Sequence, residues 1–163
     1  METVSDFEDL LRLFLKRKVE YLIIGGLAFI YHAKPRYTKD MDILVGNNIE
    51  NIHKANKALA EFGCPYLLSS KEKNKILQIG LPPNRIDLML QIPGVRFESA
   101  WKKRIKGYYG KVKVNWIDMD SLIRSKRKLK NPRHKEDVLV LLKVRDLRKG
   151  KSRKRRFSQY KIN

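Results

Sequence analysis

The sequence has little cysteine, little acid and no long apolar run. Its one cysteine, Cys64, excludes an intramolecular disulfide and any metal site built from several thiolates. The longest apolar stretch, 21–31, contains two glycines and is too short to span a bilayer. The acidic start of the chain, 1–9, lacks the basic and apolar character of a secretory signal. We therefore expect a cytoplasmic protein that does not enter a membrane.

The shortage of acid gives the chain an unusual charge. The 163 residues include 37 Lys and Arg but only 17 Asp and Glu, for a net charge of +20. Such a charge attracts polyanions, so the first expected partner is a nucleotide or a nucleic acid, RNA and a tRNA 3′ end in particular. Between 148 and 163 the sequence has eight positive charges and no acid. We expect one domain over 1–147, followed by a disordered basic tail over 148–163.

The hydrophobic pattern predicts a mixed α/β domain, because helices and strands alternate before a run of strands and a run of helices. Hydrophobic residues make up 42% of the chain, which is enough for a real core. The predicted helices are 5–18, 27–32, 49–62, 97–103, 118–129 and 134–147, and the predicted strands are 19–24, 36–45, 76–81, 86–92 and 111–117, the last as an edge strand.

Three carboxylates stand out on the predicted strands. Asp40 and Asp42 are two apart in the strand 36–45, so they share one face, with Arg36 and Thr38, opposite an apolar face. Two like charges this close repel each other unless a cation lies between them, and a hard divalent ion such as Mg²⁺ prefers oxygen ligands. Asp87 projects from an otherwise apolar strand. Pairing of the two strands would bring the three acids together in a site suited to two-metal phosphoryl transfer.

Gly25 and Gly26 lie where a predicted strand ends and a helix begins. Glycines at such a position allow backbone N–H groups to approach a phosphate, and the N-terminus of a helix favours an anion. The pattern matches neither the P-loop nor the dinucleotide-binding motif.

The glycine pair, the Asp-x-Asp strand and the later Asp together resemble the signature of the nucleotidyltransferase superfamily that shares the DNA polymerase β fold. The chain is more specifically similar to the AbiEii-like group of minimal prokaryotic nucleotidyltransferases. That similarity rests on the Arg-x-Thr-x-Asp-x-Asp segment at 36–42, the Leu-Ile-x-x-Lys helix at 122–126 and the basic turn at 133–135. It covers about residues 19–142.

The resemblance implies transfer of a nucleoside monophosphate from an NTP, ATP among them, to an acceptor hydroxyl, with release of pyrophosphate. It implies two Mg²⁺ ions, with Mn²⁺ as an alternative, held by three catalytic acids, of which the last also helps to deprotonate the acceptor: Asp40, Asp42 and Asp87. It implies contacts to the nucleotide from Gly25, Gly26, Arg36, Thr38, Lys126, Arg133 and Lys135. Relatives of the group pair with an antitoxin protein, so a toxin–antitoxin role is a further implication.

The sequence departs from the group after the basic turn. Relatives carry two acids four apart there, whereas this chain has Glu136 and Asp137 followed by apolar Leu139 and Val140. We therefore assign no catalytic acid to that helix. The acceptor stays open between RNA, a protein and a small hydroxylated molecule. Two alternatives also stay open: an inactive nucleic-acid-binding protein that keeps the fold, and a kinase-like or hydrolytic use of the same site.

Overall fold

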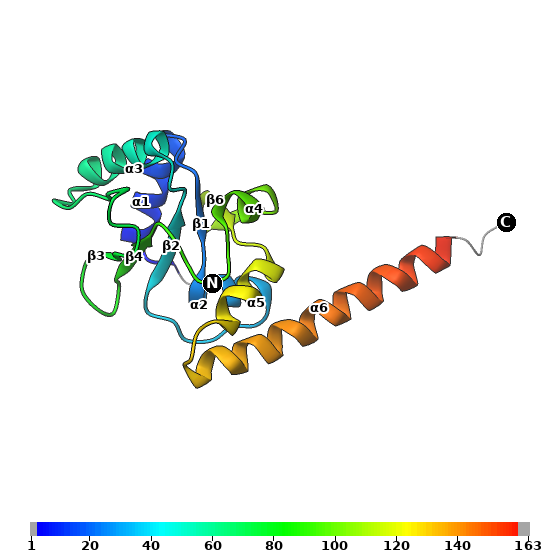
Figure 1. Cartoon of the computed structure of the whole chain (residues 1–163). Coiled ribbons are helices and arrows are strands. Elements are labelled where there is room, and N and C mark those ends of the chain that lie inside the picture. Colours follow the sequence, from blue (N-terminus) through cyan, green and yellow to red (C-terminus); the bar gives the residue numbers. More distant parts are fainter. Residues whose placement is uncertain (1–2, 160–163) are drawn as a thin grey trace.

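The computed structural model describes residues 3–159, with side chains described to residue 152, and contains one six-stranded mixed sheet with helices on both of its faces (Figure 1). Its helices are α1 (Ser5–Lys16), α2 (Gly25–His32), α3 (Ile49–Phe62), α4 (Phe97–Lys102), α5 (Met119–Arg127) and α6 (Pro132–Gln159). Its strands are β1 (Tyr21–Ile23), β2 (Met41–Val45), β3 (Leu77–Ile79), β4 (Ile86–Met89), β5 (Ile105–Tyr109) and β6 (Val112–Trp116). The mixed α/β class expected from the sequence is confirmed.

The strands follow the order β3-β4-β2-β1-β6-β5. β2 runs antiparallel to β1 and parallel to β4, while β1 is parallel to β6. β6 was expected at an edge, but β5, which the sequence analysis did not identify, takes that edge. In β6, the exposed Lys113 lies between the buried Val112 and Val114. This alternation indicates that one face of the strand is exposed to solvent. It does not distinguish an edge strand from a strand inside the sheet, which can show the same alternation.

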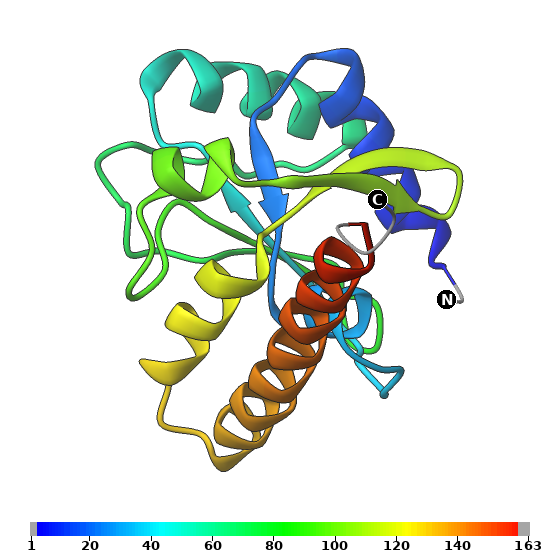
Figure 2. The same cartoon turned by 90° about the vertical axis from the view of Figure 1, so that its right-hand side faces the viewer.

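Two groups of helices cover the sheet. α1 and α3 pack together on one face, and α2, α5 and α6 gather on the other (Figures 1 and 2). α1 buries Phe7, Leu10, Leu11 and Phe14, which repeat at helical spacing. α3 has the bounds expected from the sequence because Asn48 accepts a hydrogen bond from the Asn51 N–H at its start and Gly63 ends it in the left-handed conformation.

The segment before β2 is a loop rather than a strand. The sequence predicted a strand from Arg36, but β2 begins at Met41, and 34–40 have no regular structure. β1 is only three residues long and is followed at Gly25 by α2, so this side of the sheet offers no backbone partner for 36–40. The prediction that Arg36, Thr38, Asp40 and Asp42 alternate along one strand is therefore wrong for the first three.

α6 is longer than expected from the sequence. It begins at Pro132 and continues to Gln159, beyond the predicted end at 147, and Figure 1 shows it projecting away from the rest of the molecule. Arg148 still contacts the body, because its Nη2 donates to the carbonyl of His32 at 2.8 Å. The division of the chain at residue 147 stays a prediction, and residues 160–163 of the predicted tail lie outside the described residues. Within the described range, none of the helices has both the length and the apolar character needed to cross a membrane.

Candidate active site

Two of the three carboxylates lie on paired strands. β2 and β4 run side by side in parallel, and their register places Asp42 directly opposite Asp87. Asp87 is only 6% exposed, although the residues on either side of it, Ile86 and Leu88, belong to the apolar core. The sequence predicted this juxtaposition from the position of each acid on its strand. A buried carboxylate is costly unless a partner compensates its charge, so the pair needs a cation.

Asp40 joins the pair from the loop. It lies one residue before β2, and its carboxylate shares a partner with Asp87, the Arg85 guanidinium. The Oδ1 atom of Asp40 is buried and has no hydrogen-bond partner among the described residues. The three acids thus converge, although the loop rather than an extended strand positions Asp40.

The charges at this site disfavour ionisation of Asp42. Burial, followed by the negative charges of Asp87 and Asp40, raises the pKa of the Asp42 carboxyl to about 6, against the opposing influence of Lys126 and Arg85. Like-charged carboxylates at close range behave in this way when no metal ion neutralises them. An unusually basic carboxyl in a cavity wall is typical of a functional site.

Arg85 is the cation that the structure places among these acids. Its Nε donates to Asp87 Oδ1 at 2.8 Å and its Nη2 to Asp87 Oδ2 at 3.0 Å, and Nη2 also reaches Asp40 Oδ2 at 3.2 Å. Among the described residues, no group of three or more His, Cys, Asp or Glu side chains is already arranged to hold a metal ion. Two of the three acids instead share the Arg85 guanidinium as a partner.

The glycine pair begins α2 and lies against the same acids. Gly25 has φ +65°, and a Cβ atom there would overlap the Asp42 carboxylate. A Cβ at Gly26 would lie 2.5 Å from Thr38 Oγ1. The absence of both side chains therefore lets the start of α2 approach Asp42 and Thr38. It also leaves the first N–H groups of the helix free for an anion.

Substitution of Gly25 should damage both the fold and the site. We expect Gly25→Ala to lower the free energy of unfolding by about 2 kcal/mol or more, because the side chain meets Asp42 in addition to the ~1–2 kcal/mol cost of the left-handed backbone. Gly63→Ala is the matched control, since Gly63 also has positive φ (+89°) but open space around its Cβ position. Urea denaturation of the two variants separates overlap from backbone strain, and equal losses would contradict the proposed overlap.

A buried ion-pair network that the sequence analysis missed supports one side of the site. Asp137 on α6 is 4% exposed and accepts from Arg36 Nη1 at 2.8 Å and from Lys126 Nζ at 2.7 Å. Lys126 is itself 3% exposed, and burial lowers the pKa of its ammonium group. The sequence pattern indicates no catalytic acid on this helix, because the second acid of the group's pattern is absent, and so it gives no role to Asp137. The available signal was helical spacing, since Asp137 lies four residues before the fully buried Leu141.

The structure brings only some of the remaining residues predicted to contact the nucleotide to the site. Arg133 is exposed, and its Nη2 donates to the carbonyl of Tyr37 at 2.8 Å, so it fixes the loop before β2. Thr38 faces Gly26 across that loop. Lys135 is exposed and lines neither of the cavities that reach the acids, so the structure does not bring it to the site.

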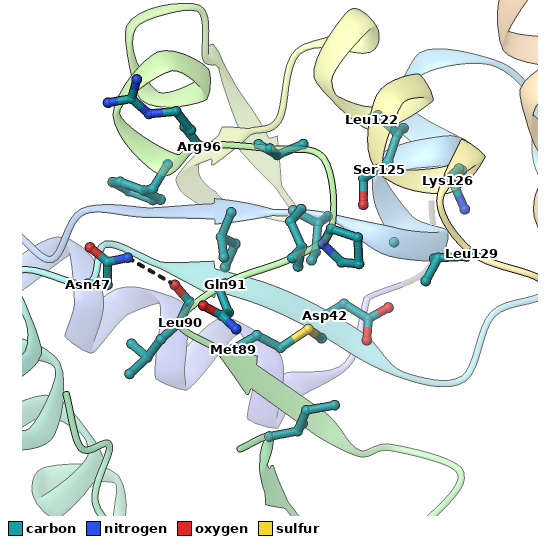
Figure 3. A pocket seen from close by; sticks show the side chains of 18 of the residues that line it. Asp42, Asn47, Met89, Leu90, Gln91, Arg96, Leu122, Ser125, Lys126 and Leu129 are labelled. Carbon is teal, nitrogen blue, oxygen red and sulfur yellow. Dashed lines mark hydrogen bonds between the residues drawn. The ribbon is translucent and has the colours of Figure 1, made fainter. Parts of the chain in front are cut away.

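A cavity of about 840 Å³ opens beside Asp42 and Gly25. Figure 3 shows Asp42 on β2 and Ser125 and Lys126 on α5 at one end of it, with Asn47, Gln91 and Arg96 toward the other end. Apolar residues form much of the wall between these ends: Leu44, Met89, Leu90, Ile92, Phe97, Leu122 and Leu129. An apolar enclosure of this volume with a few polar groups is typical of a small-molecule site. A second cavity, of about 570 Å³, lies on the side of Asp40, with Arg36, Thr38 and Lys39 in its wall.

The donor set fits a hard divalent cation. The three acids offer only carboxylate oxygens, which Mg²⁺ and Mn²⁺ accept, and the buried Oδ1 of Asp40 has no partner among the described residues. Burial and the charges of Asp87 and Asp40 raise the pKa of Asp42, and a bound cation would favour the ionised form of this carboxyl. The chemistry of these residues therefore fits such an ion, although the described side chains are not arranged around one.

Comparison with known proteins identifies the fold. The chain matches no family model and no curated protein. It is similar to the solved structure of the lincosamide antibiotic adenylyltransferase LnuA bound to lincomycin (17% identity, TM-score 0.51, 88% of this chain and 99% of that chain). It is also similar to ANT(2″)-Ia in complex with adenylyl-2″-tobramycin (15% identity, TM-score 0.52, 90% and 95%). A third similar structure is an antigenic nucleotidyltransferase-like protein from Paracoccidioides brasiliensis (12% identity, TM-score 0.51, 89% and 78%).

At these identities the similarity establishes the fold alone, which is the polymerase β-like fold of nucleotidyltransferases. The fold expected from the sequence is thus confirmed. The finer resemblance to the AbiEii-like group is not supported by these neighbours and stays a prediction.

Proposed function

We propose that the protein is a Mg²⁺-dependent nucleotidyltransferase that moves a nucleoside monophosphate from an NTP to an acceptor hydroxyl. The observation that carries this proposal is the contact between the glycine turn at the start of α2 and the Asp42 carboxylate. A site for phosphate and a ligand for a metal ion adjoin there, as nucleotidyl transfer requires. The acceptor oxygen forms a bond to the α-phosphorus, the bond from that phosphorus to the bridging oxygen breaks, and pyrophosphate leaves with the electron pair.

The proposed metal ligands are Asp40, Asp42 and Asp87. When bound, divalent ions would neutralise the triphosphate and stabilise the charge that develops on the attacking and leaving oxygens. Asp87 accepts the proton of the acceptor hydroxyl in this scheme. Asp42, whose pKa is raised to about 6, contacts the glycine turn and so faces the phosphates.

The nucleotide is proposed to enter the larger cavity. Its phosphates lie toward Gly25 and Gly26, with the buried ammonium group of Lys126 in the same wall. Its nucleoside extends along the apolar walls toward Asn47 and Gln91, whose amide groups have the donors and acceptors that can distinguish one base from another. Arg36 and Thr38 approach the glycine pair from the loop before β2 and complete the phosphate site.

The proposal is tested by label transfer. The full chain is incubated with each of the four NTPs labelled at the α-phosphate, with Mg²⁺ or EDTA, and with total RNA or total protein as acceptor. We expect label on one acceptor class, from a preferred NTP, only when Mg²⁺ is present. Transfer that is unaffected by EDTA would contradict the metal-dependent scheme.

A nucleic acid is the acceptor that the charge of the molecule favours. The net charge is +20, and Arg124, Arg127, Lys128 and Lys130 are exposed on α5 and the turn after it, next to the cavity. RNA, a tRNA 3′ end in particular, is therefore our first choice of acceptor, ahead of a protein. The similar structures name antibiotics, so a small hydroxylated molecule is tested as a third class of acceptor. Pairing with an antitoxin protein stays a prediction from the resemblance alone.

The projecting part of α6 favours a second candidate function, nucleic-acid binding without catalysis. Its sequence carries Arg148, Lys149, Lys151 and further basic residues, with no acid beyond Asp146. Like charges three and four residues apart on an isolated helix repel each other, and bound phosphates relieve that repulsion. The two functions are compatible, because α6 could bind the same RNA that accepts the nucleotide.

The contribution of α6 is measurable as a salt dependence. We expect Lys149→Gln/Lys151→Gln to weaken RNA binding and to reduce the slope of log affinity against log salt by about 1.5, since each of the two lost phosphate contacts removes roughly 0.7–0.9. Lys→Arg at the same positions keeps the charge and should keep the slope. An unchanged slope in the Gln variant would show that α6 does not bind the phosphates.

A further inference from the structure

Arg85 is bound to the very side chains that would hold the metal ions. It lies one residue before β4, and its guanidinium makes two hydrogen bonds to Asp87 and one to Asp40. These contacts raise the pKa of the Arg85 guanidinium, with the hydrogen bonds to Asp87 as the largest cause. Every polar partner of its side chain among the described residues is thus a proposed metal ligand.

The contact is not required to place the strand. The backbone of Arg85 already joins the sheet, because its carbonyl accepts from the Met41 N–H at 2.9 Å. Its side chain is 28% exposed, in contrast to 9% for the Asp87 side chain. A flexible, partly exposed arginine can turn toward solvent while the backbone stays in the sheet, whereas Asp87 cannot leave the site.

We propose that Arg85 is a resident counter-cation that compensates the carboxylates when no metal is bound and that a divalent ion must displace. This inference rests on the metal site of the proposed function. A guanidinium that donates to both Asp87 Oδ1 and Oδ2 and a metal ion bound to the same carboxylate repel each other and weaken each other's bonds to it, so the binding of one disfavours the other. Metal loading and the departure of Arg85 are therefore one coupled event.

Two consequences follow from the competition. Arg85 weakens the binding of the first divalent ion, because the ion must break the contacts to Asp87 and Asp40. Arg85 also stabilises the metal-free protein, since without it three acids converge with less positive charge between them. Arg85 thus controls metal binding through its contacts to Asp87 and Asp40, without binding the metal ion itself.

The test is a titration of the full chain with Mn²⁺ followed by electron paramagnetic resonance, in the absence of nucleotide. We expect Arg85→Gln to bind Mn²⁺ about three- to tenfold more tightly than the wild type, in line with partly exposed ion pairs. Lys39→Gln is the matched control, because Lys39 is an exposed cation next to Asp40 that makes no ion pair among the described side chains. A general charge effect would tighten binding equally in both variants and would overturn the proposal.

A second readout uses the wild type and does not depend on the folding of a variant. The Nε–H of Arg85 can be followed by NMR while Mg²⁺ is added. We expect this proton to be protected in EDTA and to lose its protection and its hydrogen-bonded shift when Mg²⁺ binds. A signal that persists unchanged at saturating Mg²⁺ would show that Arg85 stays on Asp87 and would overturn the proposal.

The outcomes separate this inference from the proposed function. Equal or weaker Mn²⁺ binding by Arg85→Gln, with binding still abolished by Asp42→Asn, would overturn the role of Arg85 and leave the metal site intact. Absence of Mn²⁺ binding in the wild type and in Arg85→Gln would overturn both. Melting in EDTA gives an independent check, since Arg85→Gln should then unfold at a lower temperature than the wild type and should regain the difference when Mn²⁺ is added.

Discussion

Asp42→Asn is expected to reduce nucleotidyl transfer by about a thousandfold or more while making the metal-free protein more stable. The loss of activity follows because Asp42 contacts the glycine turn and faces both proposed ligands, the phosphates and the metal ion. The gain in stability follows because the native site buries the Asp42 carboxyl and also holds it close to Asp87 and Asp40. Substitution of a residue that served only the fold would lower both the activity and the stability.

The stability gain has a defined dependence on pH. The pKa of Asp42 is about 6 in the folded protein, above its ordinary value of 3.8. Below the lower value the carboxyl is protonated in both the folded and the unfolded chain, so the wild type pays no penalty. As the pH rises through 6, the folded wild type loses stability relative to Asp42→Asn, by about 1–3 kcal/mol in total. Urea denaturation in EDTA at pH 4 and pH 8 measures this difference.

A matched control fixes the interpretation of that difference. Asp9 is 61% exposed on α1 and far in sequence from the acids of the site. Asp9→Asn should change neither transfer nor the dependence of stability on pH. Equal stability of the wild type and Asp42→Asn at both pH values would show that neither burial nor the neighbouring acids disfavour ionised Asp42 in the folded chain.

Asp137→Ala is expected to lower the free energy of unfolding by about 3–5 kcal/mol, because removal of one partner from a buried ion pair leaves an uncompensated charge. Here the charges left behind are Lys126, 3% exposed, and Arg36, whose guanidinium also lies 4.5 Å from the ring of Phe29. The free energy of unfolding from chemical denaturation at pH 7 measures the loss.

A double substitution distinguishes unpaired charge from lost packing. Asp137→Ala/Lys126→Met should recover part of the stability, since the methionine fills similar space without a charge. The single variant should also lose less stability near pH 10, because burial already lowers the pKa of Lys126 and removal of Asp137 lowers it further. A double variant that is less stable than the single one would contradict the ion-pair explanation.

Local chemistry explains which parts of the fold could be predicted. The helix 49–62 ends at a glycine in the left-handed conformation, and the acids Asp42 and Asp87 interrupt apolar strands, so each is visible in a short window. β5 could not be recognised, because Ile105, Lys106 and Tyr108 are exposed and leave no alternating pattern. The strand before Asp40 was predicted wrongly for a non-local reason, the early end of β1.

The candidate site shows the same division. Four site residues could be predicted because each residue type is informative at its own position. The glycines Gly25 and Gly26 allow a close approach of the backbone, and the acids Asp42 and Asp87 place a charge in an apolar strand. Asp137 and Arg85 could not be predicted in this way, because their roles depend on partners elsewhere in the chain. Asp137 bonds Arg36, which lies far earlier in the sequence, and Arg85 bonds Asp40. Lys135 fitted a motif, but the structure leaves it in solvent.

The fate of the two ends of the triphosphate tests the central claim most directly. The full chain is incubated with Mg²⁺, total RNA and the preferred NTP, labelled in parallel reactions at the α- or the γ-phosphate. Nucleotidyl transfer predicts that the α-label moves to the acceptor while the γ-label is released as pyrophosphate. Transfer of the γ-label to an acceptor, or its release as orthophosphate without α-label transfer, would contradict nucleotidyl transfer and would favour a kinase-like or hydrolytic use of the same carboxylates.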